Sequence, residues 1–252
     1  MKKLLLAFVI LVAMASEPAY AAQSYCQYGH ETAVLFVDRT TKFDKVDRSI
    51  FLDALGNLID RLGSGDRLVA VTMTGAFTDN DKLFDQCKPG CPDDGFFASL
   101  MSSCSATVAR SELRRFTRSL ALTLANLLRD PEQTPQSDLF RTIAEVTHDY
   151  ATSGNDSQPI RDVVLFSDLL ENSDLFPEQE FRRISVARAL EKLKSAEIAP
   201  DVSSGIVQVY GFGRDDSPRR PPLPQIERQR IAAIWQRWFK DGGATDVEIG
   251  FR

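Results

Sequence analysis

The sequence predicts an α/β protein with an open, mostly parallel sheet, one antiparallel edge strand and helices on both faces. The first observation is the run Ala-Val-Leu-Phe-Val at 33–37, which has no alternating polar residue and suits a strand buried on both faces. The second is that further strand-like apolar segments occur at 67–74, 162–167 and 206–212. The third is that helical patterns separate most of these segments, which favours parallel pairing through crossover connections.

The first half of the chain supplies two helices and the edge strand. Apolar residues at helical spacing predict a helix over 44–62, and Gly63 to Asp66 end it. After the strand at 67–74, Gly75 starts a turn, and 82–85 is expected to return as an antiparallel edge strand. A long apolar stripe then predicts a helix from about Ser105 or Thr107 to Arg129.

The second half continues the alternation. Helices are predicted over 137–151, 181–197 and 225–241, and a last strand over 245–249. No repeat or interdomain linker interrupts the pattern. We therefore expect a single domain over 24–252, with a cysteine-containing insertion near 86–105.

Residues 1–21 have the features of a secretory signal peptide. Lys2 and Lys3 precede an apolar run, Leu4 to Met14, that is too short for an ordinary membrane span. Ala19-Tyr20-Ala21 offers small residues for cleavage, although an uncleaved anchor is the alternative. No later segment is apolar enough to span a membrane, so the mature chain is expected to be periplasmic or secreted.

The four cysteines, Cys26, Cys87, Cys91 and Cys104, are an even number in an exported chain, which favours disulfide bonds. Three connectivities are possible, and the sequence does not choose between them. A zinc site built from Cys87, Cys91 and Cys104 is the alternative interpretation.

The composition is that of an ordinary soluble protein, with 43% hydrophobic and 26% charged residues among 252. Its net charge of −5 gives no overall basic field, so nucleic acid is not an expected partner.

Polar oxygen-bearing residues stand at the ends of predicted elements. Asp38, Thr40 and Lys42 alternate directly after the first strand, Ser137-Asp138-Leu139 opens a helix, and Asp168 closes a buried strand. In this order they resemble the three elements of the metal-ion-dependent adhesion site of von Willebrand factor A (VWA) domains. The resemblance covers roughly residues 32 to 250 and extends to the antiparallel edge strand, which that family also has.

The resemblance implies a metal site formed by Asp38, Thr40, Ser137 and Asp168. Hard oxygen ligands suit Mg²⁺ or another divalent cation, and in the family a partner protein's carboxylate completes the coordination. Lys42 departs from the family, which has a second serine there. Its ammonium group could neutralise Asp38 and Asp168 in place of a metal, so a degenerate site without a cation is the open alternative.

We therefore expect an exported VWA-like module that binds a protein partner, with no enzymatic activity, as part of a bacterial envelope or secretion assembly. The alternatives are a metal-dependent hydrolase using Asp38 and Asp168, or a structural subunit with no ligand site. Neither His30 nor His148 belongs to a recognised nucleophile motif, so the hydrolase lacks an obvious general base.

Overall fold

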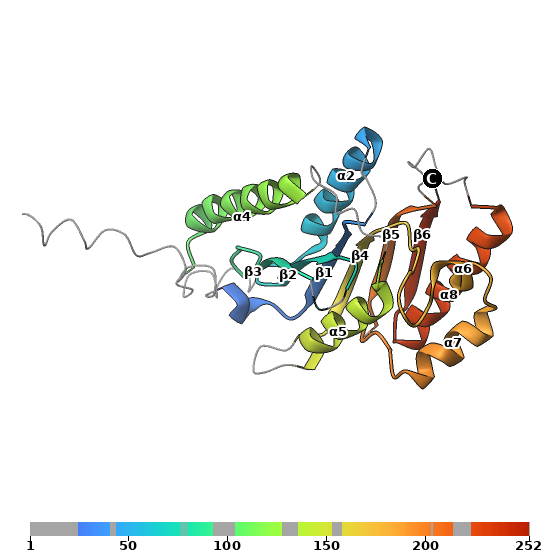
Figure 1. The fold of residues 1–252 in the computed structure, drawn as a ribbon. Helices are drawn as coiled ribbons and strands as arrows, with labels where there is room; N and C mark the ends of the chain where they lie inside the picture. Colours follow the sequence, from blue (N-terminus) through green and yellow to red (C-terminus); the bar gives the residue numbers. More distant parts are fainter. Residues whose placement is uncertain are drawn as a thin grey trace, which may run out of the picture.

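The computed structural model describes residues 25–40, 44–76, 78, 80–92, 104–127, 136–152, 158–202, 204–213 and 223–251 (Figure 1). Strands and helices alternate along most of this chain. In order they are η1 (Tyr25–Tyr28), β1 (Thr32–Asp38), α2 (Lys45–Arg61), β2 (Arg67–Met73), β3 (Lys82–Cys87), α4 (Ala106–Leu127), α5 (Leu139–Thr152), β4 (Ile160–Phe166), α6 (Glu178–Phe181), α7 (Val186–Ser195), β5 (Ile206–Phe212), α8 (Gln225–Asp241) and β6 (Asp246–Phe251).

The strands form one six-stranded sheet in the order β3-β2-β1-β4-β5-β6. β3 is antiparallel to β2, whereas the other neighbouring strands pair in parallel. The predicted class, a mostly parallel sheet with one antiparallel edge strand, is confirmed. β1 lies between β2 and β4, so its carboxyl end is surrounded by the loops that leave other strands.

Helices cover both faces of the sheet (Figure 1). Side chains of β1 alternate between two cores because successive strand residues point to opposite faces. Val34 and Phe36 pack in the larger core with residues of α5, α7 and α8. Ala33, Leu35 and Val37 pack in the second core with residues of α2 and α4. Every residue of β1 is buried, which explains its uninterrupted apolar run.

Both ends of α2 are capped by polar side chains. Asp44 accepts hydrogen bonds from the backbone N–H groups of Val46 and Asp47, and the Asp47 side chain accepts one from the Asp44 N–H. At the other end, the Lys88 ammonium donates to the carbonyl oxygens of Ile59 and Leu62. Burial lowers the pKa of Lys88. The loop after β3 is thereby fixed to the end of α2.

One predicted helix is wrong. The single helix expected over 181–197 is divided into α6 and α7, with residues 182–185 between them. The Ser185 hydroxyl accepts a hydrogen bond from the Arg188 N–H and begins α7 afresh, as serine does at helix N-termini. Phe181 and Ile184 remain buried, so the apolar spacing that suggested one helix reflects packing of two segments.

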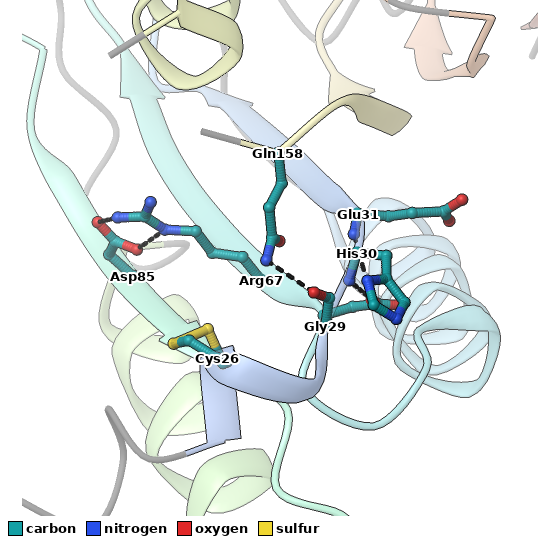
Figure 2. Close-up of a disulfide and its surroundings, with 9 residues drawn as sticks. Cys26, Gly29, His30, Glu31, Arg67, Asp85 and Gln158 are labelled. Atoms are coloured by element: carbon teal, nitrogen blue, oxygen red, sulfur yellow. Dashed lines mark hydrogen bonds and ion pairs between the residues drawn. A yellow bond between two sulfur atoms is a disulfide. The ribbon is translucent and has the colours of Figure 1, made fainter. Parts of the chain in front are cut away.

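Two disulfides connect the amino-terminal segment, β3 and α4. Cys26 pairs with Cys87, and Cys91 pairs with Cys104, so no described cysteine is free for the alternative zinc site. Figure 2 shows the first bond beside the ion pair between Arg67 and Asp85, whose Nε and Oδ1 atoms are 2.7 Å apart. The disulfide between Cys26 and Cys87 joins η1 to β3, the outermost strand of the sheet.

Within the described ranges, no helix is long and apolar enough to cross a membrane. The predicted signal peptide at 1–21, Lys42 and residues 93–103 of the cysteine-containing insertion lie outside the described residues.

Candidate functional site

Asp38 ends β1 at the carboxyl edge of the sheet, and the loop after β4 begins beside it. Val37 of β1 is in register with Phe166 of β4, so the next residues of the two strands are neighbours. The Ser167 hydroxyl donates a hydrogen bond of 2.6 Å to Asp38 Oδ2. Residues that are 129 positions apart therefore meet at this edge.

Thr40 folds back over the same carboxylate. Its backbone N–H and its hydroxyl both donate to Asp38 Oδ1, at 2.8 Å and 2.6 Å. An aspartate that accepts from the N–H two residues on forms an Asx-turn, which differs from the extended backbone that alternating side chains would need. Asp38 is fully buried, and each of its carboxylate oxygens accepts from a hydroxyl.

The loop after β4 places Asp168 next to a residue with an unusual backbone. Asp168 Oδ1 accepts a hydrogen bond of 2.9 Å from the Leu170 N–H. Leu169 has a φ of 60°, a left-handed conformation that costs a non-glycine residue about 1–2 kcal/mol. Its carbonyl oxygen accepts from Trp235 Nε1 at 3.1 Å, and its N–H donates to the Ser167 hydroxyl. Backbone strain of this kind is often found at functional loops.

Ser137 comes from a third loop, which leads into α5. Its backbone pairs with Asn172 in the loop after β4, through hydrogen bonds of 3.0 Å and 2.9 Å. Ser137 is only 4% exposed, and its hydroxyl oxygen has no hydrogen-bond partner within the part of the chain that the structure describes. Leaving a buried hydroxyl without a partner is unfavourable, so this oxygen is a candidate ligand group.

Aromatic packing fixes the position of these loops. The ring of Phe140, in the first turn of α5, stacks on Trp235 with centroids 3.8 Å apart and planes 10° from parallel. Trp235 also holds the Leu169 carbonyl oxygen. A single side chain of α8 thus supports both the start of α5 after Ser137 and the loop that carries Asp168.

Glu171, in the loop after β4, belongs to this region but to none of the sequence motifs. It is fully buried, and its Oε2 accepts from the N–H groups of Leu139 and Phe140 at 2.8 Å and 3.2 Å. Burial raises its pKa to about 8, opposed by the Ser173 hydroxyl and raised further by the charge of Asp138. No local pattern marks Glu171, because the helix end that it caps lies more than 30 residues earlier in the chain.

Asp138 adds a second partly shielded carboxylate at the same helix start. Burial raises its pKa, while the nearby Arg141 guanidinium lowers it. Arg141 Nη1 and Asp138 Oδ2 are 3.1 Å apart. The helix dipole stabilises negatively charged side chains near the first turn of a helix, which favours carboxylates such as Asp138 at the start of α5.

The four predicted site residues are therefore not all placed alike. Asp38 and Thr40 contact each other directly, Asp168 follows the serine that contacts Asp38, and Ser137 is joined to the loop of Asp168 through Asn172. Carboxylate and hydroxyl oxygens of this kind fit a hard divalent cation, and the unpartnered Ser137 oxygen is consistent with one. In the described ranges, no group of three or more His, Cys, Asp or Glu side chains could hold a metal ion, so hydroxyl ligands would be essential.

Neither histidine belongs to this edge. His30 precedes the amino end of β1, where its N–H donates to Asp66 Oδ1 at 3.0 Å. His148 lies in the later half of α5, away from the end that follows Ser137. The two imidazoles are therefore poorly placed to act as a general base beside Asp38 and Asp168.

No protein-family model matches this chain, and no curated protein matches it significantly.

Proposed function

We propose that this chain is an exported, VWA-like module that binds a protein partner through the loops at the carboxyl edge of its sheet. The observation that carries the proposal is the meeting of three loops there. The Ser167–Asp38 and Ser137–Asn172 contacts connect these loops, and the buried Ser137 hydroxyl has no hydrogen-bond partner among the described residues. Ligands of open α/β sheets bind at this edge of the strands.

The sheet also supports the VWA-like part of the proposal. The antiparallel strand β3 stands at the edge beside β2, where the sequence resemblance expects it. Asp38 ends β1, and Asp168 lies in the loop after β4; these two strands are adjacent at the centre of the sheet. The positions of Asp38 and Asp168 at the carboxyl ends of neighbouring strands support the proposal.

A divalent cation is part of the proposal. Asp38, Thr40, Ser137 and Asp168 would hold it, and it would supply a coordination position for a carboxylate of the partner. The Thr40 hydroxyl directs its proton to Asp38, which leaves its oxygen lone pairs for such an ion. The competing degenerate site, in which Lys42 replaces the cation, predicts partner binding that does not depend on metal.

The disulfide bonds of this protein are typical of an oxidising compartment. Two disulfides, together with the predicted signal peptide, favour the periplasm or the exterior of a bacterial cell. We propose that the module acts there in an envelope or secretion assembly.

Affinity capture tests the proposal. Tagged wild-type protein and an Asp168→Ala variant are incubated with envelope extract, with and without a chelator, beside the control Asp149→Ala on the exposed side of α5. We expect wild-type and control proteins to retain the same partner and Asp168→Ala to lose it. Equal capture by all three, combined with a metal-stimulated hydrolytic activity lost only in Asp168→Ala, would instead establish the hydrolase.

A further inference from the structure

The outward surface of α2 and α4 is unusual for a solvated helix layer. Both helices pack on the same face of the sheet (Figure 1). Six large hydrophobic side chains of the described residues are exposed, and four belong to these two helices: Val46 at 54%, Leu52 at 57%, Val108 at 51% and Leu122 at 57%. Apolar groups gathered on one layer favour an interaction surface over random exposure.

The outward side of α4 is strongly basic. Four exposed arginines occupy it, and none forms an ion pair with another described residue: Arg110, Arg114, Arg115 and Arg118. Among the described residues, the hydrogen-bond acceptor of the Arg110 side chain is a carbonyl oxygen of its own helix. Burial and the nearby Glu112 carboxylate raise the pKa of Tyr25. Glu112 is the one acidic residue of α4, and it forms no ion pair with another described residue.

Several arginines on other elements of this protein do have carboxylate partners. Arg61 pairs with Asp162, and Arg182 pairs with Glu227, each at 2.9 Å. The chain as a whole carries a net charge of −5. The exposed side of α4 is therefore positively charged on a protein whose net charge is negative. Such a surface favours a partner surface that is negatively charged.

The outward side of α2 supplies such a surface. Ser49, Asp53, Gly56 and Asp60 follow one another at helical spacing opposite the buried side of the helix, and all four are exposed. Neither Asp53 nor Asp60 forms an ion pair with another described residue. An added Cβ at Gly56 would meet nothing within 4 Å, so packing inside one copy does not require glycine there. Since glycine weakens a helix relative to alanine, close approach by another molecule explains it better.

We infer that the α2–α4 layer is the interface of a homodimer in which α4 of each copy lies on α2 of the other. The arginines of α4 would face Asp53 and Asp60, Gly56 would allow close approach, and Leu52 and Leu122 would be buried. Asp53 and Asp60 are about 10 Å apart along α2, and Arg110 and Arg118 are about 12 Å apart along α4. Both acids can therefore meet arginines at the same time. A two-fold axis places each contact in the interface twice.

This interface leaves the carboxyl edge of the sheet free, so it goes beyond the proposed function. A dimer would present two copies of the candidate site and could hold a repeated partner more firmly than one copy can. The dimer and the candidate site can be tested separately because they share no residue.

Charge exchange tests the dimer. Variant one carries Arg114→Glu and Arg118→Glu, variant two carries Asp53→Arg and Asp60→Arg, and a control carries Arg188→Glu and Lys194→Glu on α7, on the other face of the sheet. Sedimentation velocity and light scattering give the dimer dissociation constant of each protein. Circular dichroism checks that each one is folded.

We expect wild-type and control proteins to dimerise equally. For each charge-reversed variant alone, the dimer dissociation constant should rise about 100-fold. The symmetric interface contains the α2–α4 contact twice, and each copy of the contact should contribute about tenfold. An equimolar mixture of the two variants should regain the wild-type affinity, because each of its interfaces joins opposite charges. A monomeric wild-type protein would overturn the inference, as would a mixture that stays monomeric or variants that dimerise like wild type.

Discussion

The Ser167 hydroxyl donates a hydrogen bond of 2.6 Å to the fully buried carboxylate of Asp38, across 129 residues of sequence. The same carboxylate accepts two hydrogen bonds from Thr40. Asp38 is therefore a structural centre of the carboxyl edge, whether or not a cation binds there. This separates its role from that of Asp168.

Asp38→Ala should lower the free energy of unfolding by about 2–3 kcal/mol, because it leaves the buried Ser167 hydroxyl and the partly buried donors of Thr40 without their acceptor. Asp168→Ala should cost less, about 1 kcal/mol, since the hydrogen bond from the Leu170 N–H is only partly buried. Urea unfolding of the two variants measures the difference. A cost for Asp38→Ala no larger than that for Asp168→Ala would show that the carboxylate does not organise the edge.

The pH dependence of stability should reveal Glu171. Burial raises its pKa from 4.5 to about 8, so the folded protein binds this proton more tightly than the unfolded chain. The resulting stabilisation is complete below pH 4.5 and is lost as the pH rises through about 8.

Glu171→Gln removes the titration and keeps an oxygen that can accept from the N–H groups of Leu139 and Phe140. The variant should therefore lose less stability than wild type over this pH window, as measured by urea unfolding at a series of pH values. Identical pH profiles for the two proteins would mean that Glu171 is already ionised in the folded state.

The two disulfides should contribute unequally. Cys26 and Cys87 are separated by 61 residues, whereas Cys91 and Cys104 are separated by 13. Removing the first pair should cost about 4 kcal/mol and the second about 3 kcal/mol, because the longer closed loop restricts the unfolded chain more. Denaturation of the two paired Cys→Ala variants gives the comparison, and peptide mapping of the unreduced protein checks the pairing. Crossed linkages, such as Cys26 with Cys91, would contradict the structure.

Glycine substitutions should act in opposite directions at two sites. Gly56→Ala should raise the free energy of unfolding of the monomer by about 1 kcal/mol, because it improves helix propensity without a steric clash. Gly65→Ala should destabilise it, since Gly65 has a φ of 87° and an added Cβ would lie 2.4 Å from the Gly29 nitrogen. Thermal unfolding at a concentration that keeps the chain monomeric tests both. Destabilisation by Gly56→Ala would reveal a contact inside one copy.

Much of the sheet could be predicted from the sequence because its strands are continuous apolar runs. The strand expected over 206–212 agrees with β5, and the helix expected over 225–241 agrees with α8. The antiparallel pairing of β3 with β2 was also expected, from the turn at Gly75. These features depend on nearby residues, which a linear pattern records.

Features that depend on distant residues were not predictable. The cysteine pairing was open because it depends on which segments lie side by side, and Cys26 meets Cys87 only after η1 packs against β3. Glu171 gave no signal because its partners belong to α5. The prediction of one helix over 181–197 was wrong because apolar spacing alone does not show that a second helix begins at Ser185.

Photocrosslinking at the carboxyl edge tests the central claim most directly. A photoreactive amino acid replaces one of two exposed residues. One is Asp174 in the loop after β4, and the other is Glu197 in the turn between α7 and β5. Irradiation in intact cells should join the protein to one defined envelope protein from position 174 only, and adding Asp168→Ala should abolish that product. Equal products from both positions, or a product from position 174 that survives Asp168→Ala, would contradict a partner-binding site formed by these loops.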